Sequence, residues 1–193
     1  LAETAITDAG TGRVRVAPVL VTSRVTGYQR RAVGSHDNLG TTRLDLPPQE
    51  LETRAVVFTW DGVDHRSRAA LDAGCNAATL PGALHAAEHG AIGMLGLFGL
   101  CDRWDVGGLS TADHPDTGGP TVLIHDGYPG GAGIAELAER VAEAHLAATR
   151  AAIAECPCEA GCPSCVQSPK CGNLNEPLDK AGALIAIDAL LGR

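Results

Sequence analysis

The sequence has 193 residues, a net charge of −8, 45% hydrophobic residues and only 3% aromatic residues. This composition excludes wholesale disorder, and no apolar run approaches the ~20 residues that a membrane-spanning helix requires, so no membrane contact is expected. The negative charge argues against bulk attraction to nucleic acid, and the few aromatic rings provide few stacking platforms for single-stranded bases.

The charge is unevenly distributed along the chain. Residues 13–54 contain seven arginines and four acidic residues, so this stretch alone has a net positive charge. The chain also begins at Leu1 without an initiator methionine or an export signal. We therefore expect a fragment of a longer cytoplasmic protein, with any basic surface in its N-terminal third.

Residues 1–60 are predicted to form strands. The stretch RVRVAPVLVT, residues 13–22, is rich in β-branched residues and begins by alternating arginine with valine. TTRLDLPP and TRAVVFTW continue the pattern, with PP and DG as turn signals. Residues 80–100 are apolar and compatible with a helix, and Pro81 lies close to the expected helix start.

Residues 121–126, TVLIHD, predict a buried strand. The GYPGGAG that follows predicts a turn with positive φ at Gly130, Gly131 and Gly133. Residues 134–155 repeat apolar side chains at helical spacing and lead directly into Cys156. A second amphipathic helix is predicted over residues 178–193.

These elements predict an α+β fold. We expect a β-rich N-terminal part packed with helices, ending in a four-cysteine zinc knuckle between two helices. Within one compact domain, the expected parts are a β-rich segment (1–60), a mixed helix and strand core (61–155), and the cysteine cluster with its C-terminal helix (156–193).

Five of the seven cysteines lie within sixteen positions, in the stretch CPCEAGCPSCVQSPKC. Four converging thiolates form a tetrahedral structural zinc site, and a tight loop can supply all four. We predict that the four most closely spaced cysteines bind the metal, namely Cys156, Cys158, Cys162 and Cys165. Cys171 is then an alternate ligand or a buried thiol, and the isolated Cys75 and Cys101 are expected in the core.

Other cysteine chemistry stays open. An iron–sulfur cluster uses the same four thiolates, and a C-x-x-C redox pair is a further alternative. Disulfides need an oxidising compartment, and five clustered cysteines leave one unpaired. The stretch HAAEH also matches H-x-x-E-H, so His85, Glu88 and His89 are candidates for a metal-dependent hydrolase, although so loose a match arises easily in a helix.

Three longer stretches carry a family resemblance: ALHAAEHGAIGMLGLFGLCDRWDVGGLS, TVLIHDGYPGGAGIAELA and CPCEAGCPSCVQSPKCGNLNEPLDKAGAL. Together they resemble the C-terminal zinc-binding region of MrfA-type helicases, which are superfamily 2 ATP-dependent DNA helicases. The resemblance extends from about Leu44 to Leu190. It implies a metal role for the four cysteines, and it implies that the HAAEH match is incidental.

For a full-length parent, the resemblance implies 3′ to 5′ movement on single-stranded DNA and a role in DNA repair. ATP and Mg²⁺ would bind RecA-like motor domains before Leu1, so this fragment alone is not expected to be an enzyme. The expected partners are single-stranded DNA and those motor domains, in the cytoplasm and at the nucleoid.

The fragment is expected to brace the motor or guide the strand. Candidate DNA contacts are the following cationic and amide side chains: Arg30, Arg31, Lys170, Asn173, Asn175 and Lys180. A zinc-stabilised module for docking partner proteins is the main alternative function.

Overall fold

A computed structural model describes residues 4–6, 12–35, 37–60 and 66–193. Its main sheet has five antiparallel strands in the order β1-β2-β5-β7-β6. The strands are β1 (Thr4–Ala5), β2 (Arg13–Ser23), β5 (Gln49–Thr59), β6 (Val106–His114) and β7 (Gly119–Asp126). Strand β6 lies at one edge, and β5 lies in the middle between β2 and β7.

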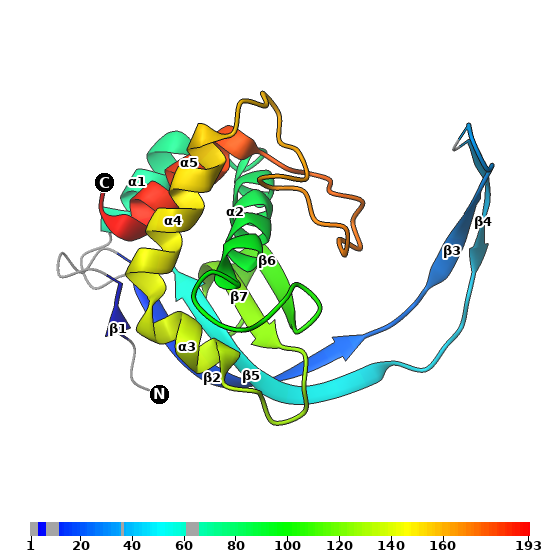
Figure 1. The fold of residues 1–193 in the computed structure, drawn as a ribbon, viewed down its shortest axis with the longest axis horizontal. Coiled ribbons are helices and arrows are strands. Elements are labelled where there is room, and N and C mark those ends of the chain that lie inside the picture. The colour runs from blue at the N-terminus through cyan, green and yellow to red at the C-terminus, as the bar shows by residue number, and fades with distance from the viewer. Residues whose placement is uncertain (1–3, 7–11, 36, 61–65) are drawn as a thin grey trace.

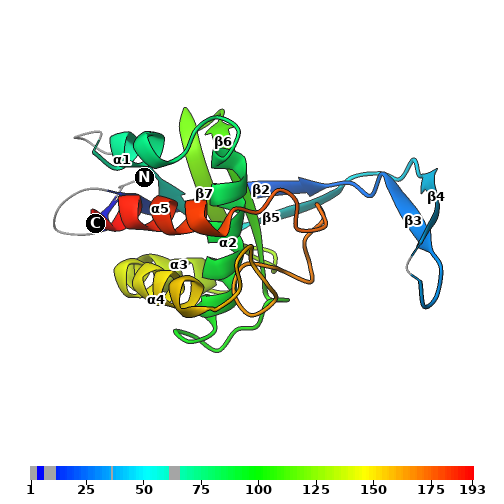
Figure 2. The same cartoon turned by 90° about the horizontal axis from the view of Figure 1, so that it is seen from above.

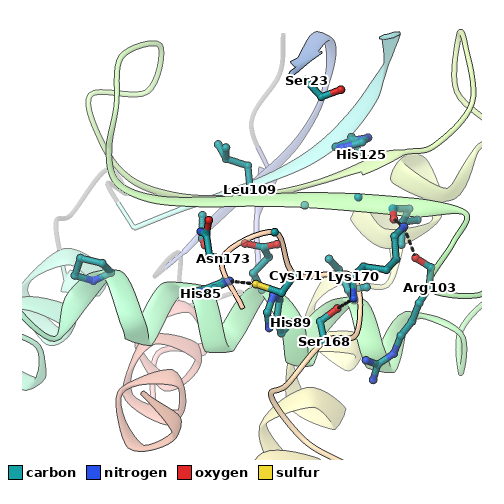
Figure 3. A pocket seen from close by; sticks show the side chains of 18 of the residues that line it. Ser23, His85, His89, Arg103, Leu109, His125, Ser168, Lys170, Cys171 and Asn173 are labelled. Atoms are coloured by element: carbon teal, nitrogen blue, oxygen red, sulfur yellow. Dashed lines mark hydrogen bonds between the residues drawn. The ribbon is translucent and has the colours of Figure 1, made fainter. Parts of the chain in front are cut away.

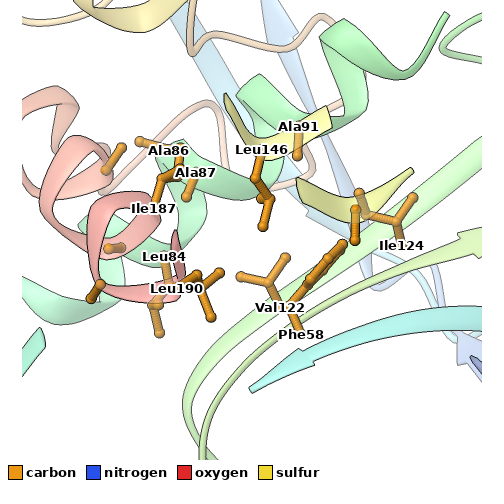
Figure 4. Packing of buried hydrophobic residues seen from close by; sticks show 14 of the residues in the cluster. Phe58, Leu84, Ala86, Ala87, Ala91, Val122, Ile124, Leu146, Ile187 and Leu190 are labelled. Carbon is orange, nitrogen blue, oxygen red and sulfur yellow. The ribbon is translucent and has the colours of Figure 1, made fainter. Parts of the chain in front are cut away.

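Helices cover one face of this sheet (Figure 2). The helices are α1 (Arg66–Gly74), α2 (Leu80–Leu95), α3 (Ile134–Arg140), α4 (Ala142–Glu155) and α5 (Lys180–Leu191). Phe58 and Ile124 from the sheet meet Leu84, Leu146 and Ile187 from three helices in the main core (Figure 4). The structure therefore confirms the predicted α+β fold, with the cysteine cluster between α4 and α5.

A long two-stranded arm extends from the sheet and curves back toward the loop after the cysteine cluster (Figure 1). We define the arm as residues 18–53. At its base, β2 and β5 pair without interruption from Arg13↔Thr59 to Ser23↔Gln49, but β7 pairs only with residues 55–59 of β5. At its tip, β3 (Gly27–Arg31) pairs with β4 (Asn38–Arg43).

Several sequence expectations hold in the structure, and two boundaries differ. Gly130, Gly131 and Gly133 of the GYPGGAG turn have positive φ, from 78° to 89°. The helix predicted over residues 134–155 is divided at Val141, which leaves helical geometry at φ −108° and ψ 16°. The helix from Leu80 ends at Leu95 instead of continuing to residue 100. None of the helices in the described part of the chain is long and apolar enough to cross a membrane.

His145 fixes α4 against α2 from within the core. Its side chain is completely buried, and its Nε2 lies 2.8 Å from the carbonyl oxygen of Ala91. Burial lowers the pKa of His145, because the charged imidazolium loses its hydration there. The folded protein therefore holds this side chain neutral at a pH where the unfolded chain already protonates it.

We expect His145 to make the protein less stable as the pH falls below about 6.5, the ordinary pKa of histidine in an unfolded chain. The unfolded state then takes up the proton first, and each unit of pKa difference corresponds to about 1.4 kcal/mol. His145→Gln keeps an N–H donor for Ala91 but cannot titrate. Urea unfolding at pH 7.5 and pH 5.0 should show a smaller loss of stability for this variant, and an equal loss would contradict the prediction.

Candidate metal centre

The cysteine cluster occupies the connection between α4 and α5. Helix α4 ends because Cys156 turns to an extended backbone, with φ −67° and ψ 123°. Gly161 then adopts φ 107°, and a Cβ added there would lie 2.5 Å from a methyl carbon of Val166, which is fully buried. Only glycine meets both conditions, so Gly161 allows the chain to turn back on itself.

The four predicted cysteines converge. Their sulfur atoms lie within 4.8 Å of one another, and the contacts between neighbouring sulfurs measure 3.5–3.8 Å. A tetrahedral zinc site with Zn–S bonds of about 2.3 Å requires sulfurs about 3.8 Å apart. The four sulfurs of Cys156, Cys158, Cys162 and Cys165 therefore fit a tetrahedral ion of this size.

Backbone and side-chain groups hold this arrangement in place. The amides of Cys165 and Val166 donate to the carbonyl of Cys162 at 3.0 and 3.2 Å, which forms the tight turn between the last two ligands. Lys180, the first residue of α5, donates through Nζ to the carbonyls of Cys156 and Cys158, both at 2.6 Å. The start of α5 is thus tied to the first half of the cluster.

The thiols also influence one another's ionisation. Desolvation raises the pKa of Cys158, but hydrogen bonds from Cys165, Cys156 and Cys162 outweigh this effect and lower it to about 7. Zinc binds the thiolate and not the thiol. The neighbouring thiols therefore favour the thiolate form of Cys158, which is the form that binds zinc.

The remaining cysteines lie outside this group. Cys75 is buried in the core, and Cys101 is half-buried and packs against it. Cys171 lies beside α2, with its sulfur 3.4 Å from Nε2 of His85. The structure thus places Cys171, the predicted alternate ligand, beside His85 and outside the four-cysteine group.

His85 and His89 lie one turn apart on α2, with ring centroids 4.3 Å apart. Together with Cys171 they form a second group whose possible ligand atoms all lie within 4.8 Å of one another. Glu88 points to β6 and bonds Ser110, and burial raises its pKa to about 7 against the opposing effect of that bond. The HAAEH histidines therefore meet a third side chain that lies 82 or more residues further along the sequence.

Four of the six candidate DNA contacts lie in or near the loop that follows the cysteine cluster. Three of these four side chains form hydrogen bonds to the backbone of the protein itself. Lys170 donates to the carbonyls of Arg103 and Val106 and lies 5.0 Å from the ring centroid of Trp104. Lys180 bonds the cysteine loop as described above, and Asn175 makes two hydrogen bonds to the backbone of Ser168. These three side chains thus serve to brace the loop.

The two arginine candidates lie on β3 in the arm. Arg31 lines an open groove between the inner side of the arm and the tip of the loop, which contributes Gly172 and Leu174. Arg30 does not line this groove, although it precedes Arg31 directly on the strand. Asn173 lines a separate cavity beside α2.

Sequence reasoning missed two further arginines of this groove, Arg24 and Arg43. Arg24 pairs with Asp45, whereas Arg43 lies opposite Gly27 in the β3–β4 ladder. The net positive charge of residues 13–54 indicated a basic surface in this part of the chain. It did not indicate which of the arginines lie on the same face.

The MrfA Zn-binding domain family matches residues 87–166, a range that contains all four clustered cysteines but neither His85 nor Cys171. Two curated proteins are similar to the chain. The uncharacterized ATP-dependent helicase YprA of Bacillus subtilis (strain 168) is 31% identical over 151 residues, which cover 77% of this chain and 19% of that protein. The uncharacterized protein MJ1572.1 of Methanocaldococcus jannaschii is 35% identical over 111 residues, which cover 56% of this chain and 99% of that protein.

A solved structure has the same fold. The crystal structure of the DUF1998 helicase MrfA bound to DNA matches 98% of this chain with a TM-score of 0.67 and 25% sequence identity. The matched region is 24% of that helicase chain. The present chain therefore spans about a quarter or less of the length of the helicases that it matches.

Proposed function

Because the chain belongs to the family of MrfA-like zinc-binding regions, we propose that it serves as the C-terminal accessory domain of an ATP-dependent superfamily 2 helicase. Such a parent would move 3′ to 5′ along DNA during repair, in the cytoplasm and at the nucleoid. In this proposal the four cysteines hold Zn²⁺, and the domain braces the motor and guides single-stranded DNA. The sulfur geometry and the match to the zinc-binding family both support zinc.

The groove between the arm and the cysteine loop is the observation that carries the guiding role. Arg31 and Arg43 both line it and lie on adjacent strands of the arm tip. The loop after the cysteine cluster forms the opposite wall of the groove. Arginine guanidinium groups can bind phosphate oxygens with two N–H donors at once. Polar and cationic walls with few aromatic rings suit contact with a DNA backbone more than contact with its bases.

We expect the double variant Arg31→Ala/Arg43→Ala to weaken binding of single-stranded DNA by the 193-residue chain. Binding by a chain of net charge −8 should be weak and steeply dependent on salt. Loss of two phosphate contacts should reduce the slope of log K against log salt by about 1.4, since each contact on a single strand contributes about 0.7. Fluorescence anisotropy with a labelled oligonucleotide, repeated at several salt concentrations, measures both quantities.

The matched control is Arg68→Ala/Arg140→Ala, which removes the same charge from α1 and α3, away from the arm (Figure 2). This control should bind DNA nearly as well as the unmodified chain. Equal weakening by both double variants would show that only net charge matters, and it would remove the support for the groove. Unchanged binding by the arm variant would contradict the guiding role directly.

A docking role remains the second candidate function because the arm also exposes large apolar side chains. Val33 at the tip is fully exposed, and Val25 and Leu39 are each 57% exposed. Exposed apolar side chains on an arm that extends from the sheet would provide apolar contact area for a protein surface, such as a motor domain of the parent. Val33→Ser/Leu39→Ser would then weaken binding to the motor domains while leaving the DNA affinity of this chain unchanged.

A further inference from the structure

We propose that His85, His89 and Cys171 form a second metal site, separate from the four-cysteine centre, which binds a divalent transition metal such as Zn²⁺. Helix α2 supplies both histidines, and the loop after the cysteine cluster supplies the thiol (Figure 3). Their possible ligand atoms lie within 4.8 Å of one another. Zinc commonly combines imidazole and thiolate ligands, and three protein ligands are typical of sites that keep an open coordination position.

The hydrogen bonds of both histidines engage Nδ1 and leave Nε2 available to bind a metal. Nδ1 of His85 lies 2.8 Å from the carbonyl oxygen of Pro177, and Nδ1 of His89 lies 2.8 Å from that of Val166. A carbonyl oxygen only accepts, so each Nδ1 must carry the proton and each neutral Nε2 keeps its lone pair. Histidine ligands in metal sites are oriented in this way, by a backbone or carboxylate acceptor on the nitrogen that does not bind the metal.

Cys171 completes the set. Its sulfur lies 3.4 Å from Nε2 of His85, close to the distance of about 3.6 Å that separates nitrogen and sulfur ligands around tetrahedral zinc. The amide of Asn175 donates to the same sulfur at 3.3 Å, and such a bond stabilises a thiolate. These two contacts hold the half-buried sulfur of Cys171 beside the histidines.

The fourth coordination position faces a cavity of about 600 Å³. Beyond the ligands, the cavity wall combines apolar residues such as Ile92 and Leu109 with the polar side chains of Glu88, Arg103, His125, Ser168, Lys170 and Asn173. A water molecule would fill the remaining position there. The four-cysteine centre, by contrast, provides all four ligands from its own sulfurs.

A metal at this second site would fasten the loop of residues 166–177 to α2. The carbonyls of Val166 and Pro177 mark the two ends of this loop, and both already accept hydrogen bonds from the histidines. Cys171 lies between these ends. The same loop contributes Gly172 and Leu174 to the basic groove, so the ion would fix the wall that faces the arm.

The test counts zinc ions per chain by native mass spectrometry, after dialysis of the whole 193-residue protein against zinc and then buffer. We expect two ions in the unmodified protein and one in Cys171→Ser. His89→Gln, which keeps an N–H donor for Val166, should also retain one. Cys101→Ser makes the same chemical change in a half-buried thiol outside both groups, and it should retain two.

Several outcomes would overturn the proposal. A single ion in the unmodified protein, unchanged by Cys171→Ser, would show that the second group holds no metal. Loss of both ions from a folded Cys171→Ser protein would show that Cys171 belongs to the other centre. Unfolding of the variants would not block the test, because alkylation of the unmodified protein provides a separate measure. Added zinc should protect Cys171 from iodoacetamide at least ten-fold in peptide mass spectra, and unprotected Cys171 would refute the site.

Discussion

The double variant Cys158→Ser/Cys165→Ser is expected to lose the zinc of the four-cysteine centre and to release the connection between α4 and α5. Zinc binding to small zinc-finger peptides contributes about 10–16 kcal/mol, and much of it is used to order the peptide. Here the cluster residues bury little apolar surface apart from Cys165 and Val166, so the ion should supply most of their order. We expect a loss of roughly 3–5 kcal/mol and a fall in Tm of about 10 °C.

Thermal unfolding and hydrogen exchange would check this result. Exchange should rise throughout residues 156–179 but stay low in β5 and β7, whose pairing and core do not involve the metal. Cys101→Ser again provides the matched control and should change little. Full zinc retention in the double variant would contradict the assignment, and a coloured protein with charge-transfer absorption would indicate an iron–sulfur cluster instead.

The second large effect is expected at Trp60, which joins the end of β5 to α5. Its side chain is completely buried, and its Nε1 donates to the carbonyl of Ala186 at 2.9 Å. Trp60→Ala should reduce the free energy of unfolding by about 3–5 kcal/mol, the usual range when a large aromatic side chain is removed from a core.

Trp60→Phe separates packing from hydrogen bonding. It keeps most of the buried volume but leaves the carbonyl of Ala186 without this donor, so the expected loss is about 1–3 kcal/mol. Urea unfolding followed by circular dichroism measures both variants. Equal losses for the two would show that the hydrogen bond, and not the packing of the indole ring, carries the effect.

Local spacing was enough to predict the four-cysteine group and most of the regular elements. The cysteines are at most nine positions apart, so one loop brings them together whatever the rest of the fold does. Strands β2 and β5 and the helices from Leu80, Ile134 and Lys180 also follow periodic patterns of apolar residues. Strand β6 gave no such signal, because VGGLSTADH is rich in glycine and polar residues and forms a strand by pairing with β7.

Contacts between distant segments could not be predicted in this way. The spacing within HAAEH indicates two histidines on one helix face, but it contains no information about Cys171, which is 86 positions from His85. Composition likewise made Lys170 and Lys180 candidates for phosphate contact. Only the fold shows that the ammonium groups of both bond backbone carbonyls around the cysteine loops.

The arm has a mechanical consequence for the domain. Strand β5 is continuous from Gln49 at the arm to Thr59 in the middle of the sheet, and the next residue, Trp60, is anchored to α5. Because β2 pairs with β5 along the whole base of the arm, a load on the tip would reach the main sheet through both strands and would reach α5 through Trp60. The arm would therefore act as a lever that is fixed at the sheet and at α5.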